Sequence, residues 1–301
     1  MPQHFLDIDD IDAAELDQLL DRAERLKAER ADGAMEATLP GHTLGMIFQK
    51  PSTRTRVSFE TGMQQLGGQA IFLGSDDIQL GHGEPLKDTA RTLSRYVDCL
   101  MARVFTHEHV EVLAEYATVP VINGLTDDAH PCQTLADLLT IREAMGGLSD
   151  VSVTWIGDGN NVAQSFAIGC AIAGIDLTVV TPSGYGIDES VLDRAADLGA
   201  APTTSTDPAA VAGADVIYTD VWVSMGQEDE RDTKLADFDG FQVNESLLEH
   251  APGARVMHCL PAHRGEEITD AAIEDGRSIV FDQAENRLHA QKALLEWVLR
   301  A

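Results

Sequence analysis

The residues best suited to chemistry lie in one segment rich in hydroxyl groups and cations, residues 49–60 (QKPSTRTRVSFE). The apolar residues 45–48 before it are typical of the end of a buried strand, and the apolar spacing after it predicts a helix. Residues 52–55 therefore fall on the first helical turn, where backbone N–H groups and the positive end of the helix dipole meet. Arg54 and Arg56 add guanidinium groups, which can grip phosphate oxygens in bidentate fashion. This combination predicts a phosphate site, and a simple helix cap with solvated arginines is the alternative.

A second segment, residues 129–137 (AHPCQTLAD), places an imidazole and an amide where another helix begins. His130 and Gln133 can hydrogen-bond a carbonyl oxygen and an amide nitrogen of a small ligand. Two further polar segments, residues 220–226 (DVWVSMG) and 258–261 (HCLP), each follow a short apolar strand. Open α/β sheets bind ligands at the carboxyl ends of their strands, so both segments are candidate binding segments.

The elements that must position these segments alternate between short apolar strands and amphipathic helices. Helices are predicted over residues 13–30 and 284–299, among others. Such alternation predicts an α/β fold with two domains, each a mainly parallel sheet flanked by helices and joined by interdomain helices. A turn-rich break (GGLSD) starts at Gly146, so we expect domains over residues 1–146 and 147–283. The predicted strands are residues 44–48, 69–73, 99–104, 119–123, 151–156, 176–181, 216–218, 255–257 and 278–280.

Composition restricts the class of protein further. The 301 residues, 44% of them hydrophobic, suffice for two domains with a core each. Twenty-one basic residues against 50 acidic ones give a net charge of −29, more acidic than solubility requires. Such a surface repels nucleic acid and anionic membranes, so neither is an expected partner. Scattered acids with few lysines are typical of a halophile's cytoplasmic enzyme, and an ordinary acidic mesophilic protein is the alternative.

The cysteine pattern and the N-terminus indicate a soluble cytoplasmic protein. Four cysteines stand at wide spacings and no Cys-x-x-Cys pair occurs, so reduced thiols are expected. The N-terminus has no basic region followed by a long apolar one, and no stretch approaches the roughly 18 apolar residues of a membrane span. His107 with His109, and the His258–Cys259 pair with His263, are residues of metal-binding types. A third and a fourth ligand are missing at the usual spacings, so no metal site is predicted.

Residues 157–162 (GDGNNV) form a glycine-rich segment after a predicted strand. Dinucleotide-binding folds also begin with a glycine-rich turn after a strand. Val162 stands where the third glycine of that fingerprint belongs. The acid expected about 20 residues later is also missing from the end of the next strand. The pattern therefore disfavours an NAD-dependent dehydrogenase.

In order and spacing, four motifs closely resemble those of the transcarbamoylases, the aspartate/ornithine carbamoyltransferase family. They are STRTR at residues 52–56, HPCQ at 130–133, Asp220 with SMG at 224–226, and HCLP at 258–261. The first two motifs are shared across that family, and the last two resemble its ornithine branch. The likeness spans almost the whole chain. It implies a carbamoyl phosphate-binding domain over residues 1–146, on which the C-terminal helix 284–301 packs, and an ornithine-binding domain over 147–283.

The resemblance implies attack of the δ-amine of L-ornithine on the carbonyl carbon of carbamoyl phosphate, giving L-citrulline and phosphate. This reaction serves arginine biosynthesis or, in reverse, arginine catabolism, and it needs no cofactor. Thr55, Arg103 and His130 are expected to stabilise the oxyanion of the tetrahedral intermediate. The catalytic residues implied are Arg103, His130, Asp220 and Cys259. The substrate-binding residues implied are Ser52, Thr53, Arg54, Thr55, Gln79, Arg103, His130, Pro131, Cys132, Gln133, Asn161, Asp220, Ser224, Met225, Cys259, Leu260 and Arg287.

Asp220 and Cys259 are the candidates to orient the amines of the substrate. An inert buried thiol is the alternative for Cys259. In the family a loop of one subunit completes the site of its neighbour, and residues 77–84 match that loop with Gln79 as the contact. The resemblance therefore implies a homotrimer or a multiple of trimers.

Other members of the same class are the main alternatives. Carbamoyltransferases that act on another amine, such as putrescine or acetylornithine, are disfavoured by the intact SMG segment at residues 224–226. A non-catalytic homologue would be expected to lose key residues, but the chain retains Arg54, Arg103, His130 and Asp220.

Overall fold

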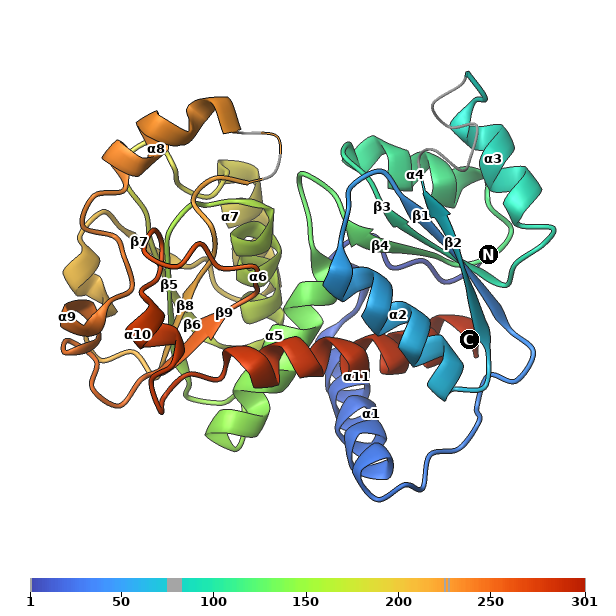
Figure 1. Cartoon of the computed structure of the whole chain (residues 1–301), viewed down its shortest axis with the longest axis horizontal. Helices are drawn as coiled ribbons and strands as arrows, with labels where there is room; N and C mark the ends of the chain where they lie inside the picture. Colours follow the sequence, from blue (N-terminus) through green and yellow to red (C-terminus); the bar gives the residue numbers. More distant parts are fainter. Residues whose placement is uncertain (1, 75–82, 225, 227, 301) are drawn as a thin grey trace. The chain divides into compact units, whose positions relative to one another are not determined.

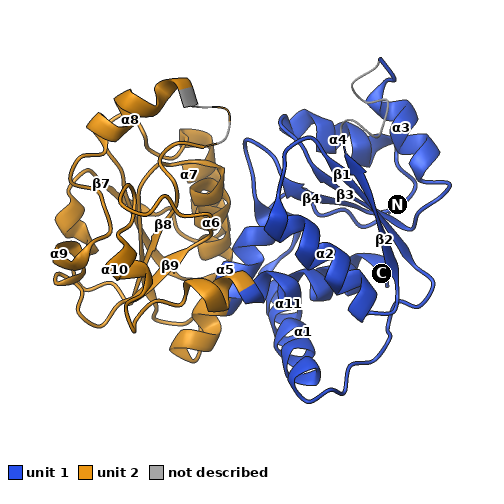
Figure 2. Ribbon diagram, viewed as in Figure 1, with its two compact units in different colours: residues 1–139, 285–301 blue, residues 140–284 orange. Residues whose placement is uncertain are grey.

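The computed structural model describes residues 2–74, 83–224, 226 and 228–300. The chain forms two compact units, shown in Figure 2. Unit 1 comprises Met1–Leu139 and Glu285–Ala301, and unit 2 comprises Thr140–Ala284. The chain leaves unit 1 within helix α5 (Pro131–Met145) and returns to it within helix α11 (Val280–Leu299).

Unit 1 contains a four-stranded parallel sheet within the described residues, with strand order β2-β1-β3-β4 (Figure 1). Its strands are β1 (Thr43–Phe48), β2 (Gln69–Gly74), β3 (Cys99–Arg103) and β4 (Val121–Leu125). Its other elements are η1 (Ile8–Asp10), α1 (Ala13–Ala31), α2 (Thr53–Gln65), α3 (Leu86–Leu93) and α4 (His107–Tyr116).

The alternation of side chains along β3 decides what each face of this sheet contacts. Leu100 and Ala102 pack in one apolar cluster with Val110 and Leu113 of α4. Successive side chains of a strand point to opposite faces, so Arg103 projects from the other face. On that face its guanidinium group reaches Thr55 of α2. Arg103, at the carboxyl end of β3, is therefore part of the candidate site.

The described part of unit 2 contains a five-stranded parallel sheet of order β7-β6-β5-β8-β9. Its strands are β5 (Ser152–Ile156), β6 (Asp176–Val180), β7 (Thr203–Ser205), β8 (Val216–Thr219) and β9 (Arg255–His258). Its remaining elements are α6 (Asn161–Ala173), α7 (Glu189–Leu198), η3 (Pro208–Val211), η4 (Glu228–Glu230), α8 (Arg231–Asp237), α9 (Glu245–Leu248) and α10 (Asp270–Ile273).

Aromatic side chains fill both faces of this second sheet. On the α6 face, Phe166 meets the Tyr218 ring edge-on, with ring centroids 5.1 Å apart. On the other face, Trp222 stacks on Phe238 at 5.2 Å, in a cluster that includes Ile217 of β8. The segment that follows β8 is therefore anchored on the core by Trp222.

The predicted fold class, two mainly parallel sheets flanked by helices, is confirmed. The predicted strand at residues 278–280 is wrong: Ser278 forms a single bridge to Val256, and Val280 already begins α11. Strand β7 was not predicted, because three polar residues at a sheet edge carry no hydrophobic pattern. Among the described residues, no helix is long and apolar enough to cross a membrane.

Candidate active site

The sheet of unit 1 has a topological switch point between β1 and β3, because the chain continues from β1 to β2 on one side and later adds β3 on the other. Open α/β sheets bind ligands outside the carboxyl ends of the strands at such a point. Residues 49–55 follow β1 directly, and Arg103 ends β3. The backbone N–H of Gln49 donates to the carbonyl of Arg103 at 2.9 Å, which holds the two strand ends together.

Ser52 caps the helix that begins at this edge. Its backbone is extended, and its hydroxyl accepts from the N–H of Thr55 at 3.2 Å, so α2 starts at Thr53. The first turn of a helix presents backbone donors and the positive end of its dipole, which favours a phosphate group. Thr53 is exposed and Arg54 half-buried on this turn, so both lie where an anion can reach them.

Thr55 starts a chain of hydrogen bonds through buried polar side chains. Its hydroxyl oxygen accepts from Nη2 of Arg287 at 2.9 Å and from Nη1 of Arg103 at 3.5 Å. Nη1 of Arg287 donates to Oε1 of Gln133 at 2.8 Å, and Nε2 of Gln133 donates to Oδ1 of Asp137 at 2.8 Å. The structure thus brings together residues from α2, β3, α5 and α11. Both guanidinium groups, those of Arg103 and Arg287, belong to buried residues.

His130, just before α5, is buried, and its pKa lies well below the ordinary value. Burial is the largest cause, and the positive charges of Arg287, Arg103 and Arg54 add to it. The imidazole is therefore neutral at pH 7, with one ring nitrogen able to donate a hydrogen bond and the other able to accept one. Such a group can polarise a carbonyl oxygen without releasing a proton to it.

Cys132 is turned away from this chain of hydrogen bonds. Its thiol contacts the backbone carbonyl of Asn123 in β4 at 3.2 Å, and burial raises its pKa to about 12. The Cys132 side chain is therefore a protonated packing group, and Pro131 serves as the first residue of α5. A contact of Cys132 with substrate would therefore use its backbone.

Lys50 was not predicted as a site residue, although it lies inside the first motif. It is buried, forms an ion pair with Asp127, and lies 4.6 Å from the centroid of the Phe105 ring. This burial could not be predicted from the sequence, because a lysine beside a proline is ordinarily solvated. Its ion pair ties the end of β1 to the loop before His130.

Three adjacent strands of unit 2 end together at a second switch point. Trp155 of β5 pairs with Tyr218 of β8, and Tyr218 pairs with Met257 of β9. The residues that follow these strands are therefore neighbours, and Asp220 and Cys259 leave the sheet side by side. The sheet grows from β5 toward β6 on one side and β8 on the other, so this edge is also a candidate ligand-binding position.

Asp220 is buried and accepts hydrogen bonds from two neutral donors. The Cys259 thiol is 2.9 Å from Oδ1, and Nδ2 of Asn160 is 2.8 Å from Oδ2. Asn160 also caps α6, since its Oδ1 accepts from the N–H groups of Val162 and Ala163. Asn161, the half-buried first residue of α6, was the predicted site residue. Asn160 was not predicted, although its place directly before a helix was an available signal.

Leu260, which follows Cys259, has a φ of 60°, in the left-handed region that leucine rarely adopts. Its N–H donates to Nδ1 of His258 at 2.8 Å. Because Nδ1 accepts, Nε2 is the ring nitrogen that donates, and it does so to Oε1 of Glu267 at 3.0 Å. The buried His258–Glu267 pair thus holds the turn, and no motif in the sequence pointed to Glu267.

The ligand atoms of Asp220, His258 and Cys259 lie within 4.8 Å of one another, as do those of His263, Glu266 and Glu267. The sequence spacing did not predict either group. Both ring nitrogens of His258 already hydrogen-bond protein groups, so this ring would have to give up a contact to bind a metal. His107, a third residue of a metal-binding type, is the first residue of α4, and its Nδ1 lies 3.0 Å from the Thr126 hydroxyl.

Ser224 is half-buried in the segment after β8. Gln79 and Met225, two further predicted site residues, lie outside the described residues.

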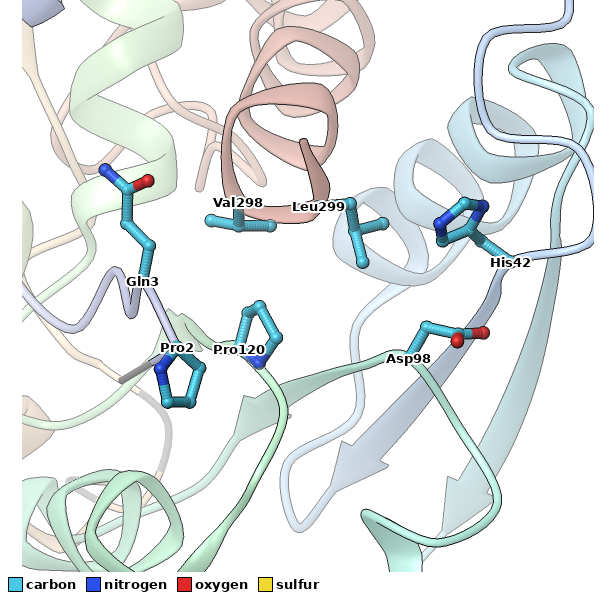
Figure 3. Close-up of a pocket in the computed structure, with 7 residues that line it drawn as sticks. All are labelled: Pro2, Gln3, His42, Asp98, Pro120, Val298 and Leu299. Atoms are coloured by element: carbon cyan, nitrogen blue, oxygen red, sulfur yellow. The ribbon is translucent and has the colours of Figure 1, made fainter. Parts of the chain in front are cut away.

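Unit 1 also has an open hollow of about 640 Å³, shown with its lining residues in Figure 3. His42, Asp98 and Pro120 line it, and each directly precedes a strand of the sheet. The hollow is therefore at the amino ends of the strands, whereas Arg103 is at a carboxyl end. Its other lining residues are Pro2, Gln3, Val298 and Leu299.

The chain is a two-unit α/β protein, with a buried arginine cluster beside a capped helix start in one unit and a buried carboxylate–thiol pair in the other. Comparison with known families agrees with this class. Residues 3–143 match the "Aspartate/ornithine carbamoyltransferase, carbamoyl-P binding domain", and residues 149–298 match the "Asp/Orn binding domain" of the same family. The chain belongs to the aspartate/ornithine carbamoyltransferase family.

Individual relatives are similar along almost their whole length. The ornithine carbamoyltransferase of Haloquadratum walsbyi is 67% identical over 293 residues, covering 97% of this chain and 96% of the relative. The anabolic ornithine carbamoyltransferase of Pyrococcus furiosus is 54% identical over 301 residues, 98% of this chain and 96% of the relative.

Solved structures give the same result. Ornithine carbamoyltransferase from Pyrococcus furiosus superposes with a TM-score of 0.96 at 52% identity, covering 100% of this chain and 98% of the other. The enzyme from Thermus thermophilus gives 0.90 at 46% identity, covering 99% of each chain. The predicted family is thereby confirmed.

Proposed function

We propose that this protein transfers the carbamoyl group of carbamoyl phosphate to the δ-amine of L-ornithine, giving L-citrulline and phosphate. The observation that carries this proposal is the buried group of Thr55, Arg103 and Arg287 around a neutral His130 in unit 1. Relatives up to 67% identical that are named ornithine carbamoyltransferase support the choice of ornithine.

Unit 1 is assigned carbamoyl phosphate. The capped start of α2, with Ser52, Thr53 and Arg54, would bind the phosphate group and stabilise it as it leaves. The Thr55 hydroxyl, Arg103 and the neutral His130 would donate to the carbonyl oxygen as negative charge develops on it. Arg287 holds the Thr55 hydroxyl, and Gln133 and Asp137 hold Arg287 in turn. A donor that is fixed in this way need not reorganise during the reaction, which is the condition for strong electrostatic catalysis.

Unit 2 is assigned ornithine. Asp220 would attract an ammonium group, and Asn161 and Ser224 would take the α-amino acid end. The attacking amine must be neutral, yet an alkyl amine has a pKa of about 10.4, so the site must select or create that form. Asp220, with the Cys259 thiol on its other oxygen, would orient the amine, and the departing phosphate would accept its proton.

A homotrimer, or a multiple of trimers, is part of this proposal, with Gln79 completing the site of a neighbouring copy. The edge position of β2 supports it, since an edge strand offers backbone groups and side chains to another chain. Ile71 on that strand and Val57 on α2 are 45% and 55% exposed, an unusual setting for β-branched apolar residues. The activity is placed in the cytoplasm, where the four cysteines would stay reduced.

The test is citrulline formation by the purified oligomer in concentrated KCl, with carbamoyl phosphate and, in parallel, ornithine, putrescine, acetylornithine or aspartate. Product with ornithine alone supports the proposal. Product with another amine would support carbamoyl phosphate as the ligand of unit 1 and would overturn ornithine as the ligand of unit 2. A folded oligomer inactive with every amine would be a non-catalytic homologue.

A further inference from the structure

A buried ion pair in unit 2 lies next to the proposed ornithine residues without being one of them. Nζ of Lys234, on α8, is 2.6 Å from Oδ2 of Asp158, in the turn between β5 and α6. Lys234 is 3% exposed and Asp158 is 9% exposed. Burying both charges costs free energy that their attraction only partly returns, so such a pair is poor evidence of a stabilising role and invites another explanation.

The turn that Asp158 belongs to is closely confined. The carbonyl of Asp158 accepts from the indole N–H of Trp155 at 3.0 Å, and the N–H of Gly159 donates to the carbonyl of Tyr185 at 2.8 Å. A Cβ at Gly159 would lie 2.5 Å from the backbone of Gly186. Asn160, the next residue, donates to Asp220. A shift of Asp158 would therefore pass along two residues of backbone to the carboxylate proposed to bind the amine.

Helix α8 begins seven residues after Ser224. The ion pair of Lys234 therefore also holds the helix that comes next in the chain after the proposed ornithine segment. A second contact holds the same helix: the Tyr185 hydroxyl donates to Oδ2 of Asp237 at 2.7 Å. Nζ of Lys234 lies 5.7 Å from the centroid of the Tyr185 ring. Tyr185 also accepts from Gly159, so both contacts of α8 involve residues that hold the β5–α6 turn.

The two neighbouring carboxylates have different partners. Asp158 has an internal cation, whereas Asp220 accepts from a thiol and an amide, both neutral. Burial raises the pKa of Asp158, the Lys234 contacts lower it, and the negative charge of Asp220 raises it further, so the carboxylates influence each other. Lys234 neutralises one of them and leaves the charge of the other for a substrate ammonium.

We infer that Lys234 is a positioning residue for the amine substrate, acting through Asp158 to hold the β5–α6 turn and thereby Asn160 and Asp220. This inference rests on the proposed function, because it takes ornithine as the amine. It assigns Lys234 no contact with substrate or with carbamoyl phosphate.

The test compares Lys234→Met, Lys234→Arg and Asp158→Asn with the wild-type oligomer in concentrated KCl. Lys234→Met should raise the KM for ornithine about tenfold or more, which corresponds to about 1.4 kcal/mol. Asp158→Asn should raise it in the same direction. Lys234→Arg, which keeps the charge, should stay near wild type, and the KM for carbamoyl phosphate should change little in every variant.

Arg231→Met is the matched control, because Arg231 starts the same helix and its ion pair with Glu266 is exposed. It should leave both Michaelis constants unchanged. A purely structural role predicts a lower unfolding temperature for Lys234→Met with an unaltered KM for ornithine, and that result would overturn the inference. Equal rises in both Michaelis constants would also overturn it.

Calorimetric titration with ornithine in the presence of phosphate gives a second readout that does not depend on turnover. The dissociation constant should rise in Lys234→Met and in Asp158→Asn, so the inference stays testable through Asp158→Asn if Lys234→Met fails to fold. Unchanged affinity in a folded variant would contradict the inference alone. A wild-type protein that neither binds nor carbamoylates ornithine would instead contradict the proposed function, and the amine that is used would then replace ornithine in the same comparison.

Discussion

Thr55→Val removes one hydroxyl from the centre of the unit 1 site while keeping the shape of the side chain. The hydroxyl accepts from Arg287 at 2.9 Å and from Arg103 at 3.5 Å, and Thr55 is fully buried. Loss of a hydrogen bond to a charged group costs about 1.5–3 kcal/mol. The substitution therefore leaves two buried guanidinium groups less well fixed, in addition to removing a proposed oxyanion donor.

The expected kinetic result follows from the loss of the proposed oxyanion donor. Removing one oxyanion donor lowers kcat by about 10² to 10³, or about 2.7–4 kcal/mol of transition-state stabilisation. The KM for carbamoyl phosphate should rise by less than kcat falls, because the hydroxyl is assigned to the transition state more than to ground-state binding. The KM for ornithine should be unchanged. Steady-state citrulline formation with each substrate varied in turn measures all three values.

Thr134→Val is the matched control. Thr134 is also fully buried in unit 1, and its hydroxyl has no hydrogen-bond partner among the described residues. The same change of atoms should therefore leave kcat near that of the wild type. A Thr55→Val enzyme whose kcat stays within about threefold of the wild type would refute the assignment of Thr55.

Two further predictions concern the whole protein. Burial is the main cause that holds the pKa of His130 well below its ordinary value and that of His289 at about 3, whereas both titrate at about 6.5 when unfolded. The unfolded chain therefore binds more protons below pH 6.5, and each histidine should remove about 1.4 kcal/mol of stability per pH unit as the pH falls. Denaturant unfolding at pH 7 and pH 5.5 should show a smaller loss for His289→Gln, and an equal loss would contradict this. The net charge of −29 should also weaken the oligomer below about 1 M salt, as screening of the acidic surfaces is lost, so an unchanged sedimentation coefficient in dilute buffer would count against that expectation.

The fold class was predictable because alternating strand and helix patterns are local properties of the chain. The edge strand β7 and the false strand at residues 278–280 show the limit of such patterns. Three polar residues can pair at an edge without any apolar signal. Conversely, an apolar pair such as Ile279–Val280 fits a strand and a helix start equally well.

The residues of the unit 1 site were predicted by type and motif, but their contacts were not. Thr55 and Arg287 are 232 residues apart in the chain, and Gln133 and Arg287 are 154 apart. Lys234 escaped prediction for another reason. It lies in a strongly acidic stretch, residues 228–239, where a lysine would ordinarily be solvated, and only the tertiary structure shows that it is buried with Asp158.

The discontinuity of unit 1 has a consequence for the order in which the protein is made. Arg287 donates to Thr55 and Gln133, yet it belongs to the last 17 residues, which join unit 1 only after the whole of unit 2 has been synthesised. Nascent chains that stop before Arg287 have α2 and the sheet of unit 1 but lack the guanidinium that joins them to α5. The anion site of unit 1 can therefore be completed only after the chain of unit 2 has been synthesised.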